Sequence, residues 1–213
     1  MMANIFARPP RFLFIFLGVL LCLLGFTNSH AAASLAQLAT RLDKASVVHA
    51  EFSQTKTLLA LKRPLKTAGR MVFARNRGVL WQIERPYQAS YTLSADRVVE
   101  IGPDGARKVR AAREVPALSQ IGRVFEALFQ GDAAVLEQYF QVAVGGSTER
   151  WRVDLAPKPE LARFLKGISA QGSQFLETIE VHEAQGDLTR IEFRDSRLDL
   201  PLSEAEARLL RGD

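Results

Sequence analysis

The sequence predicts an α+β fold that is mainly β, in which a curled antiparallel sheet forms a half-open barrel covered by short helices. Three observations predict it. Many short segments alternate apolar and polar residues, turn-forming residues separate these segments, and two helical patterns carry an apolar stripe. Because twist accumulates from strand to strand, an antiparallel sheet of this length must curl, and the two amphipathic helices can then cover its concave side.

The N-terminal residues have the pattern of a secretory signal peptide. Arg8 and Arg11 precede fifteen residues without a charge, Phe12 to Phe26, and small residues follow from Ala31 to Ser34. A helix of that length spans about 22 Å, less than the roughly 30 Å of a bilayer's hydrocarbon core. We therefore expect export and cleavage near Ala31 to Ala33, with an uncleaved N-terminal anchor as the alternative.

The expected division is a signal peptide over residues 1–33 and one domain over residues 34–213. No internal repeat and no low-complexity tract marks a second domain. The sole cysteine, Cys22, lies inside the apolar run, so the exported domain has no disulfide and depends on a packed core. Loss of Arg8 and Arg11 lowers the formal net charge of +5 by two, which leaves a mildly basic protein without the charge pattern of a nucleic-acid binder.

The alternating segments predict a long antiparallel meander that is solvated on its outside. After the tight connection from Asn76 to Gly78, one strand face holds Val79 and Trp81, and we expect the opposite face, which holds Leu80, to point to solvent. The expected strands cover residues 47–61, 67–75, 79–86, 89–94, 97–101, 139–144, 150–155, 164–170, 175–182 and 188–194.

Two helical stripes accompany the strands. Ser34 can cap a first helix whose apolar stripe runs from Leu35 to Leu42. A second helix repeats apolar residues at helical spacing and ends before Gly131. Its stripe consists of Ile121, Val124, Phe125, Leu128 and Phe129. The chain closes with a short helix-like tail over residues 200–210.

The motifs of an enzyme are sparse. His49 and His182 are the only histidines after the expected signal peptide, and no His or Cys spacing suits a metal. No nucleophile-elbow or phosphate-loop motif occurs. Glu180 and His182 share a strand face, but it lies opposite Ile179, so we interpret it, like the surroundings of His49, as a solvated face. We expect no catalytic residue, no metal and no cofactor.

The hairpin from Gly69 to Pro86 carries the most specific motif. A glycine-led strand ends in Arg75, a short turn follows, Trp81 stands six residues after the arginine, and Pro86 closes the second strand. This combination resembles the signature of the periplasmic outer-membrane lipoprotein carriers, the LolA-like family. Weaker similarity extends over most of the chain to about Arg197, through Phe52 to Gln54, Trp151 to Pro157 and the closing hairpin around Gly186 and Asp187.

The resemblance implies a carrier in which an arginine helps to hold a lid shut over an apolar cavity and releases it during cargo transfer. By position this role falls on Arg75, whereas Val79 matches an aromatic residue that contributes to cargo binding, and Trp81 matches the family's tryptophan. Asn76 and Val79 depart from the proline and phenylalanine usual there, and the tail lacks an additional C-terminal loop and strand. These departures indicate a divergent branch and leave open which lipid is carried.

The residue pattern also favours a site on the apolar face of the hairpin. Arg75 has the parity of Met71 and Phe73, and a guanidinium pointing into an apolar interior costs on the order of several kcal/mol unless it finds partners. The alternative is an exposed arginine at a strand end. We expect the cargo-binding residues to be Arg75, Val79, Trp81, Met71, Phe73, Phe125 and Phe129. For Trp81 and the two helical phenylalanines, an ordinary core position is the alternative.

These observations together predict a monomeric carrier that binds the acyl chains of a lipoprotein or another lipid and shuttles them from the inner to the outer membrane. Its partners would be an inner-membrane donor complex and an outer-membrane acceptor, and no nucleic acid. One alternative is an envelope sensor or regulator on the same scaffold. The other is a hydrolase or acyltransferase, which the missing motifs disfavour.

Overall fold

The computed structural model describes residues 46–94, 96–114, 123, 124, 126–128, 132–147 and 149–211. All of them belong to one compact unit, residues 32–213. The expected signal peptide and the expected first helix lie outside the described residues.

The described residues form an eleven-stranded sheet in which all neighbours are antiparallel. Its strands are β1 (Val47–Thr57), β2 (Leu65–Ala74), β3 (Gly78–Arg85), β4 (Ala89–Leu93), β5 (Arg97–Ile101), β6 (Arg107–Ala111), β7 (Phe140–Gly146), β8 (Trp151–Pro157), β9 (Leu165–Gly172), β10 (Leu176–Glu183) and β11 (Leu188–Leu198).

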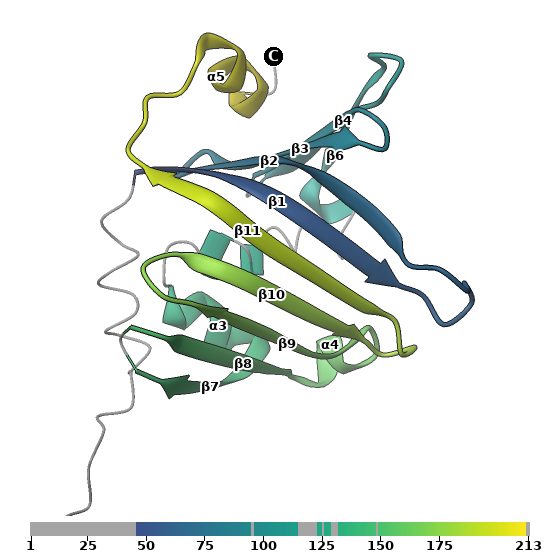
Figure 1. The fold of residues 1–213 in the computed structure, drawn as a ribbon, viewed down its shortest axis with the longest axis vertical. Coiled ribbons are helices and arrows are strands. Elements are labelled where there is room, and N and C mark those ends of the chain that lie inside the picture. The colour runs from purple at the N-terminus through teal and green to yellow at the C-terminus, as the bar shows by residue number, and fades with distance from the viewer. Residues whose placement is uncertain are drawn as a thin grey trace, which may run out of the picture. The chain divides into compact units, whose positions relative to one another are not determined.

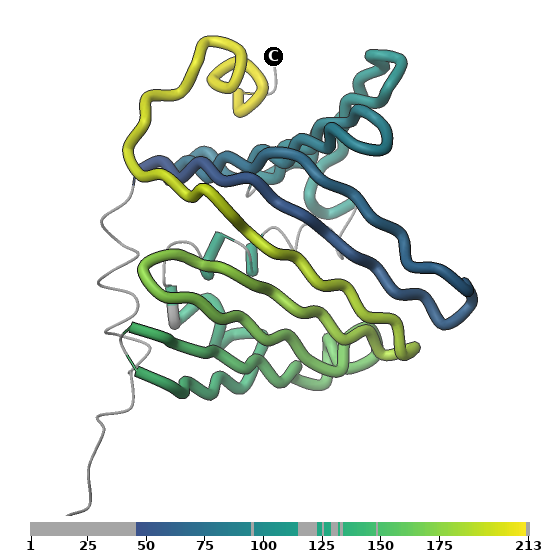
Figure 2. The backbone as a smooth tube through the Cα atoms, viewed as in Figure 1, coloured from purple at the N-terminus to yellow at the C-terminus, as the bar shows by residue number. Residues whose placement is uncertain are grey.

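The sheet is curled but not closed (Figures 1 and 2). Its spatial order is β6-β5-β4-β3-β2-β1-β11-β10-β9-β8-β7, so β6 and β7 are its two edges. It is therefore not one continuous meander, as the sequence predicts, but two meanders joined where the first strand pairs with the last. The mainly β fold class with an open, curled antiparallel sheet is confirmed.

Four short helical elements accompany the described strands. They are the 3₁₀ helix η1 (Ala112–Glu114) and the α-helices α3 (Ala133–Tyr139), α4 (Pro159–Ala162) and α5 (Glu204–Arg211). The described residues between 123 and 128 are helical as well, which agrees with the predicted second helix. The sequence interpretation misses β6, η1, α3 and α4.

One sheet face, here called the inner face, carries the main apolar core. Phe52, Met71, Phe73 and Val79 lie in this core, and side chains from the helical elements join it. The helical contributors are Val124, Ala127, Leu128, Leu136 and Leu161. Short helices therefore pack on the inner face, as the sequence predicts.

The opposite, outer face is also buried over β2 and β3. Val72, Ala74 and Leu80 form a second apolar cluster with Leu210 of α5, and Leu202 and Leu209 pack against it. In Figure 1, α5 lies on the side of β2 and β3 away from α3. The expectation that this face, with Leu80, points to solvent is wrong, because the C-terminal segment folds back over it.

Candidate functional site

Three aromatic side chains meet on the inner face. The Trp81 ring of β3 stacks on Phe52 of β1, with ring centroids 3.8 Å apart and planes inclined by 28°. The ring of Phe193, on β11, is nearly perpendicular to the same indole, with ring centroids 6.1 Å apart. Stacked and T-shaped aromatic pairs contribute stability beyond the burial of their apolar area. We call Phe52, Trp81 and Phe193 the aromatic cluster.

The strand between the two stacked rings contains a glycine. Gly69 on β2 is in register with Phe52 on one side and with Ile83 on the other. Strands β1 and β3 are two strand spacings apart, about 10 Å, so the rings of Phe52 and Trp81 must meet above β2. Gly69 lies at the irregularity in the β2–β3 pairing, where the β3 backbone comes so close that a Cβ atom would lie 1.9 Å from the carbonyl oxygen of Gln82.

The predicted residues of the hairpin divide into two groups. Met71, Phe73 and Val79 are fully buried in the core of the inner face. Trp81 is only partly buried and packs against that core, so part of its surface is accessible. Of these four predicted apolar residues, Trp81 is the one that a ligand can reach without a rearrangement of the protein.

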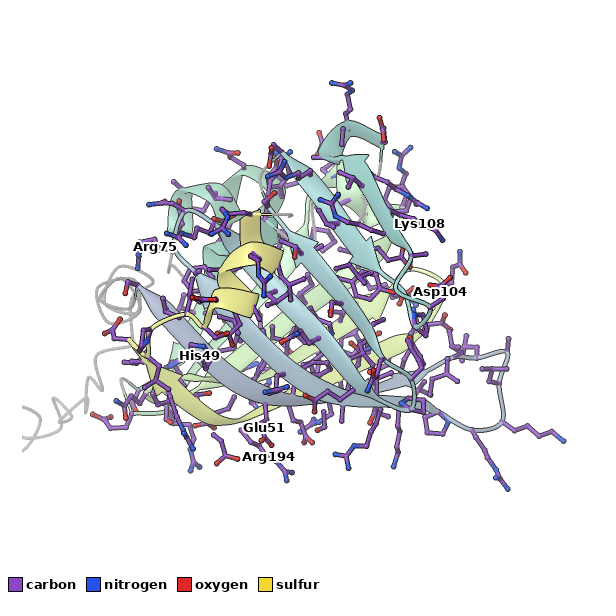
Figure 3. All side chains as sticks on the ribbon, turned by 90° about the horizontal axis from the view of Figure 1, so that it is seen from above. His49, Glu51, Arg75, Asp104, Lys108 and Arg194 are labelled. Carbon is purple, nitrogen blue, oxygen red and sulfur yellow. The ribbon has the colours of Figure 1, made fainter. Side chains whose placement is uncertain are left out.

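Arg75 lies in the turn between β2 and β3, and its side chain is half-buried. Its backbone N–H donates to the carbonyl of Ser46 at 2.9 Å. Figure 3 shows Arg75 at the margin of the sheet, beyond α5. The turn itself depends on left-handed backbone at Asn76 (φ 61°) and Gly78 (φ 104°). Phe125 and Phe129, the two predicted helical residues, lie outside the described residues.

A margin of accessible apolar surface borders the inner core. It consists of side chains that are only partly buried and that come from both the sheet and α3. They are Trp81, Ile83, Leu93, Val135, Tyr139, Val142, Val144, Leu165 and Val181. Such a surface can accept acyl chains or another apolar ligand, because removing it from water is favourable without any directional bond.

A polar strip borders the aromatic cluster toward the edge strand β6. Tyr91 is in register with Trp81 on one side and Glu100 on the other, and Glu100 is in register with Lys108. Burial raises the pKa of the Tyr91 phenol, and the neighbouring Glu100 carboxylate, which accepts its hydrogen bond, and Tyr87 raise it further. Tyr91 therefore remains a neutral hydrogen-bond donor beside Trp81.

The sequence interpretation places His49 on a solvated face, and this prediction is wrong. His49 is half-buried on the outer side of β1, and its Nε2 atom lies 3.4 Å from Oε1 of Glu206 in α5. The Ser203 hydroxyl donates to the other oxygen of Glu206 at 2.8 Å. The serine is thus bonded to the carboxylate and not to the imidazole, which is not the arrangement that activates a serine nucleophile.

The other histidine is exposed, as expected. His182 lies 3.9 Å from Glu180, which also pairs with Arg190. Within the described ranges, no group of three or more His, Cys, Asp or Glu side chains is placed to hold a metal ion. The helices in these ranges are also too short or too polar to cross a membrane.

Comparisons with known proteins give a consistent result. A family model described as "Outer membrane lipoprotein carrier protein LolA-like" matches residues 27–198. A protein named "Outer-membrane lipoprotein carrier protein" from Nitrosospira multiformis is 29% identical over 185 residues, or 82% of this chain and 83% of the relative. One of the same name from Methylococcus capsulatus is 26% identical over 200 residues, or 91% and 90%.

Two solved structures are similar to this chain at lower identity. A LolA superfamily protein from Nitrosomonas europaea is 9% identical, with a TM-score of 0.44 and coverage of 80% of this chain and 96% of that chain. A putative outer membrane lipoprotein-sorting protein domain from Vibrio parahaemolyticus is 11% identical, with a TM-score of 0.47 and coverage of 86% and 100%. The family match ends at the last residue of β11, so α5 lies outside it.

Proposed function

We propose, because the chain belongs to the family of LolA-like outer membrane lipoprotein carrier proteins, that it binds the acyl chains of a lipoprotein or of another lipid on its inner face. It carries them through the periplasm from an inner-membrane donor to an outer-membrane acceptor. It binds its cargo and does not transform it. The observation that carries this proposal is the aromatic cluster, whose indole, Trp81, stands partly accessible beside a margin of apolar side chains.

Apolar contact supplies enough affinity for this role. Each CH₂ group that leaves water contributes about 0.8 kcal/mol, so a few acyl chains bind usefully without a covalent step. Binding of this kind is non-directional, and the cargo can pass to an acceptor that offers a more favourable apolar surface. The flat indole of Trp81 adds a rigid contact beside the aliphatic side chains of Ile83 and Leu93.

Arg75 is proposed to act as the latch between the open and closed states. Its position in the β2–β3 turn places it at the end of the strands that carry Phe73 and Val79. A half-buried guanidinium gains from carbonyl or carboxylate partners, and losing them favours the open state. In this role Arg75 changes how long cargo stays bound.

Native mass spectrometry with lipid extraction tests the proposal. The protein is purified without detergent from the periplasm of its own host, in the form that the host produces. We expect a species with a bound lipid or lipoprotein. The Trp81→Ala variant is expected to fold and to contain a smaller fraction of lipid-bound protein. If the protein is always empty and instead co-purifies with one stoichiometric protein partner, the carrier function is rejected in favour of an envelope regulator.

A matched pair of arginine variants tests the latch. Arg75→Leu is expected to change the retention time of bound lipid during dilution. Arg77→Leu, in the same turn but with an exposed side chain, is expected to leave it unchanged. Equal retention in both variants and the wild type would remove Arg75 from the mechanism while leaving the cargo site intact.

A further inference from the structure

The hairpin between β1 and β2 ends in an unusual apolar and basic tip. Residues 57–66, here called the hairpin tip, include Leu59, Leu61 and Leu65, whose side chains are 74%, 47% and 52% exposed. Among the described residues, these are three of the eight exposed large hydrophobics. Single exposed leucines are ordinary on protein surfaces, but three within ten consecutive residues need an explanation.

The same residues carry positive charge without negative charge. Lys62, Arg63 and Lys66 are exposed, and residues 57–66 contain no Asp or Glu. Lys56, just before the tip, pairs with Glu183 at 2.6 Å. The nearest carboxylate from the adjoining β10–β11 turn is that of Asp187, which accepts a hydrogen bond from the Leu59 backbone N–H at 2.9 Å. The tip therefore keeps an excess of cations.

The hairpin tip is both projecting and held in place. It extends past the neighbouring strands in the two directions of view (Figures 1 and 3). The Leu61 N–H bonds to the Leu58 carbonyl at 3.0 Å, and Asp187 fixes the backbone at Leu59. A Cβ added to Gly186 would come within 2.7 Å of Leu59, so the β10–β11 turn supports the tip closely.

From these observations we propose that the hairpin tip docks the protein onto an anionic membrane surface, with the leucines entering the headgroup region and the cations facing acidic lipid headgroups. Exposed apolar side chains beside Lys and Arg are the combination that binds such interfaces. A stable protein interface buries about 1,000 Å² or more, which a narrow projecting hairpin does not offer, whereas a fluid bilayer accepts a small convex tip. The inference goes beyond the carrier function and does not depend on which cargo is bound.

Vesicle flotation tests the proposal with the protein as purified from its host. Vesicles contain either phosphatidylcholine alone or phosphatidylcholine with phosphatidylglycerol. We expect binding to the anionic vesicles and loss of that binding in high salt, because screening removes the attraction between exposed charges and headgroups. The Leu59→Ser, Leu61→Ser, Leu65→Ser variant is expected to lower the partition coefficient at least about tenfold.

A charge variant and a matched control separate the tip from general basicity. Lys62→Gln, Arg63→Gln, Lys66→Gln neutralises three cations and is expected to lower the partition coefficient about fivefold for each. Arg150→Gln, Lys166→Gln, Arg194→Gln removes three exposed cations outside the tip and is expected to retain at least half of the binding. Circular dichroism and thermal unfolding check that each variant folds.

Other outcomes overturn the inference. Absence of binding to both kinds of vesicle, equal binding to both, or an equal loss in the control variant rejects the tip as an anionic membrane anchor. A photo-crosslinker at position 61 that captures one protein in the host, with no vesicle binding, assigns the tip to a protein partner. Because lipid extraction measures cargo separately, a tip variant that keeps its cargo but no longer floats also distinguishes this inference from the proposed carrier function.

Discussion

Gly69 has more influence on the inner face than its size suggests. The rings of Phe52 and Trp81 stack across the strand that contains it. We expect Gly69→Ala to destabilise the protein by about 1–3 kcal/mol, because the added methyl group would lie 1.9 Å from a backbone carbonyl that cannot swing away. Urea unfolding followed by circular dichroism measures the free energy.

The matched control for this substitution is Gly145. This residue is also in a strand, but a Cβ atom there would have nothing within 4 Å. Gly145→Ala is expected to leave the free energy of unfolding within about 0.5 kcal/mol of the wild type. An equal loss in the two variants would show that the effect does not come from the close approach of the Gln82 carbonyl to Gly69.

Only part of the aromatic cluster could be predicted from the sequence. The hairpin motif identifies Trp81 directly. Phe52 and Phe193 each show the correct strand parity, but nothing local reveals that β1 pairs with β11, which is what brings both rings to Trp81. The short-range pattern specifies which face a side chain occupies, whereas the strand order specifies which side chains meet.

At the scale of elements, α5 begins with a capping box. The Ser203 N–H and hydroxyl donate to the Glu206 carboxylate at 2.7 and 2.8 Å, and the Glu206 N–H donates back to the Ser203 hydroxyl at 3.2 Å. Burial acts to raise the pKa of Glu206, but the hydrogen bonds from Ser203 and the adjacent His49 outweigh it and hold the pKa below its ordinary value. The capping box therefore stabilises α5 when the Glu206 carboxyl group is ionised.

This shift gives a pH dependence with a definite sign. The folded pKa lies below the unfolded value, so the stabilisation is complete above about pH 4.3 and is lost as the pH falls through the lowered folded value. We expect Glu206→Gln to be less stable than the wild type at pH 7 and to approach it near pH 3. Urea unfolding at both values measures this. Glu204→Gln, on the same helix, should show a smaller difference, and an equal difference would contradict the role of the capping box.

The packing of α5 on the sheet is a second property of this element. Leu210 is buried in the outer cluster against Val72, Ala74 and Leu80. We expect Leu210→Ala to lower the free energy of unfolding by about 2–4 kcal/mol, since it removes buried methyl groups and leaves a cavity. Leu200→Ala, at an exposed leucine of the same segment, should change it little. Thermal unfolding of both variants measures this difference. An equal, small effect in the two variants would mean that α5 is a loosely attached tail.

The elements that sequence reasoning missed share a physical reason. Val109 is the one large apolar residue in β6, so no alternation marks that strand. Helix α3 is a seven-residue element whose clearest signal is Asp132, which caps it through Val135. The residues from Met71 to Ala74 are apolar on both parities, which fits the burial on two faces that the structure shows, although the sequence interpretation took the second face as solvated. Their outer partner, however, comes from the far end of the chain, where local patterns give no information.

At the scale of the whole molecule, an open sheet must protect its edges. Strand β6 is exposed along its length and carries Arg107, Lys108 and Arg110. If two copies paired antiparallel about Val109, each Lys108 would face an Arg110 of the other copy, and like charges in directly opposed positions destabilise the pair. These cations therefore keep an edge with free backbone groups from joining another chain.

Removing this protection is expected to change the association state. Lys108→Thr with Arg110→Thr converts β6 into an edge of high strand propensity without opposed charges. We expect the variant to form dimers that increase with concentration in size-exclusion chromatography with light scattering, while the wild type stays monomeric. Lys62→Thr with Arg63→Thr removes the same charge from the hairpin tip and should stay monomeric. Dimers in this control would mean that net charge, and not the chemistry of the β6 edge, keeps the protein monomeric. No dimers in the β6 variant would mean that Lys108 and Arg110 do not protect this edge.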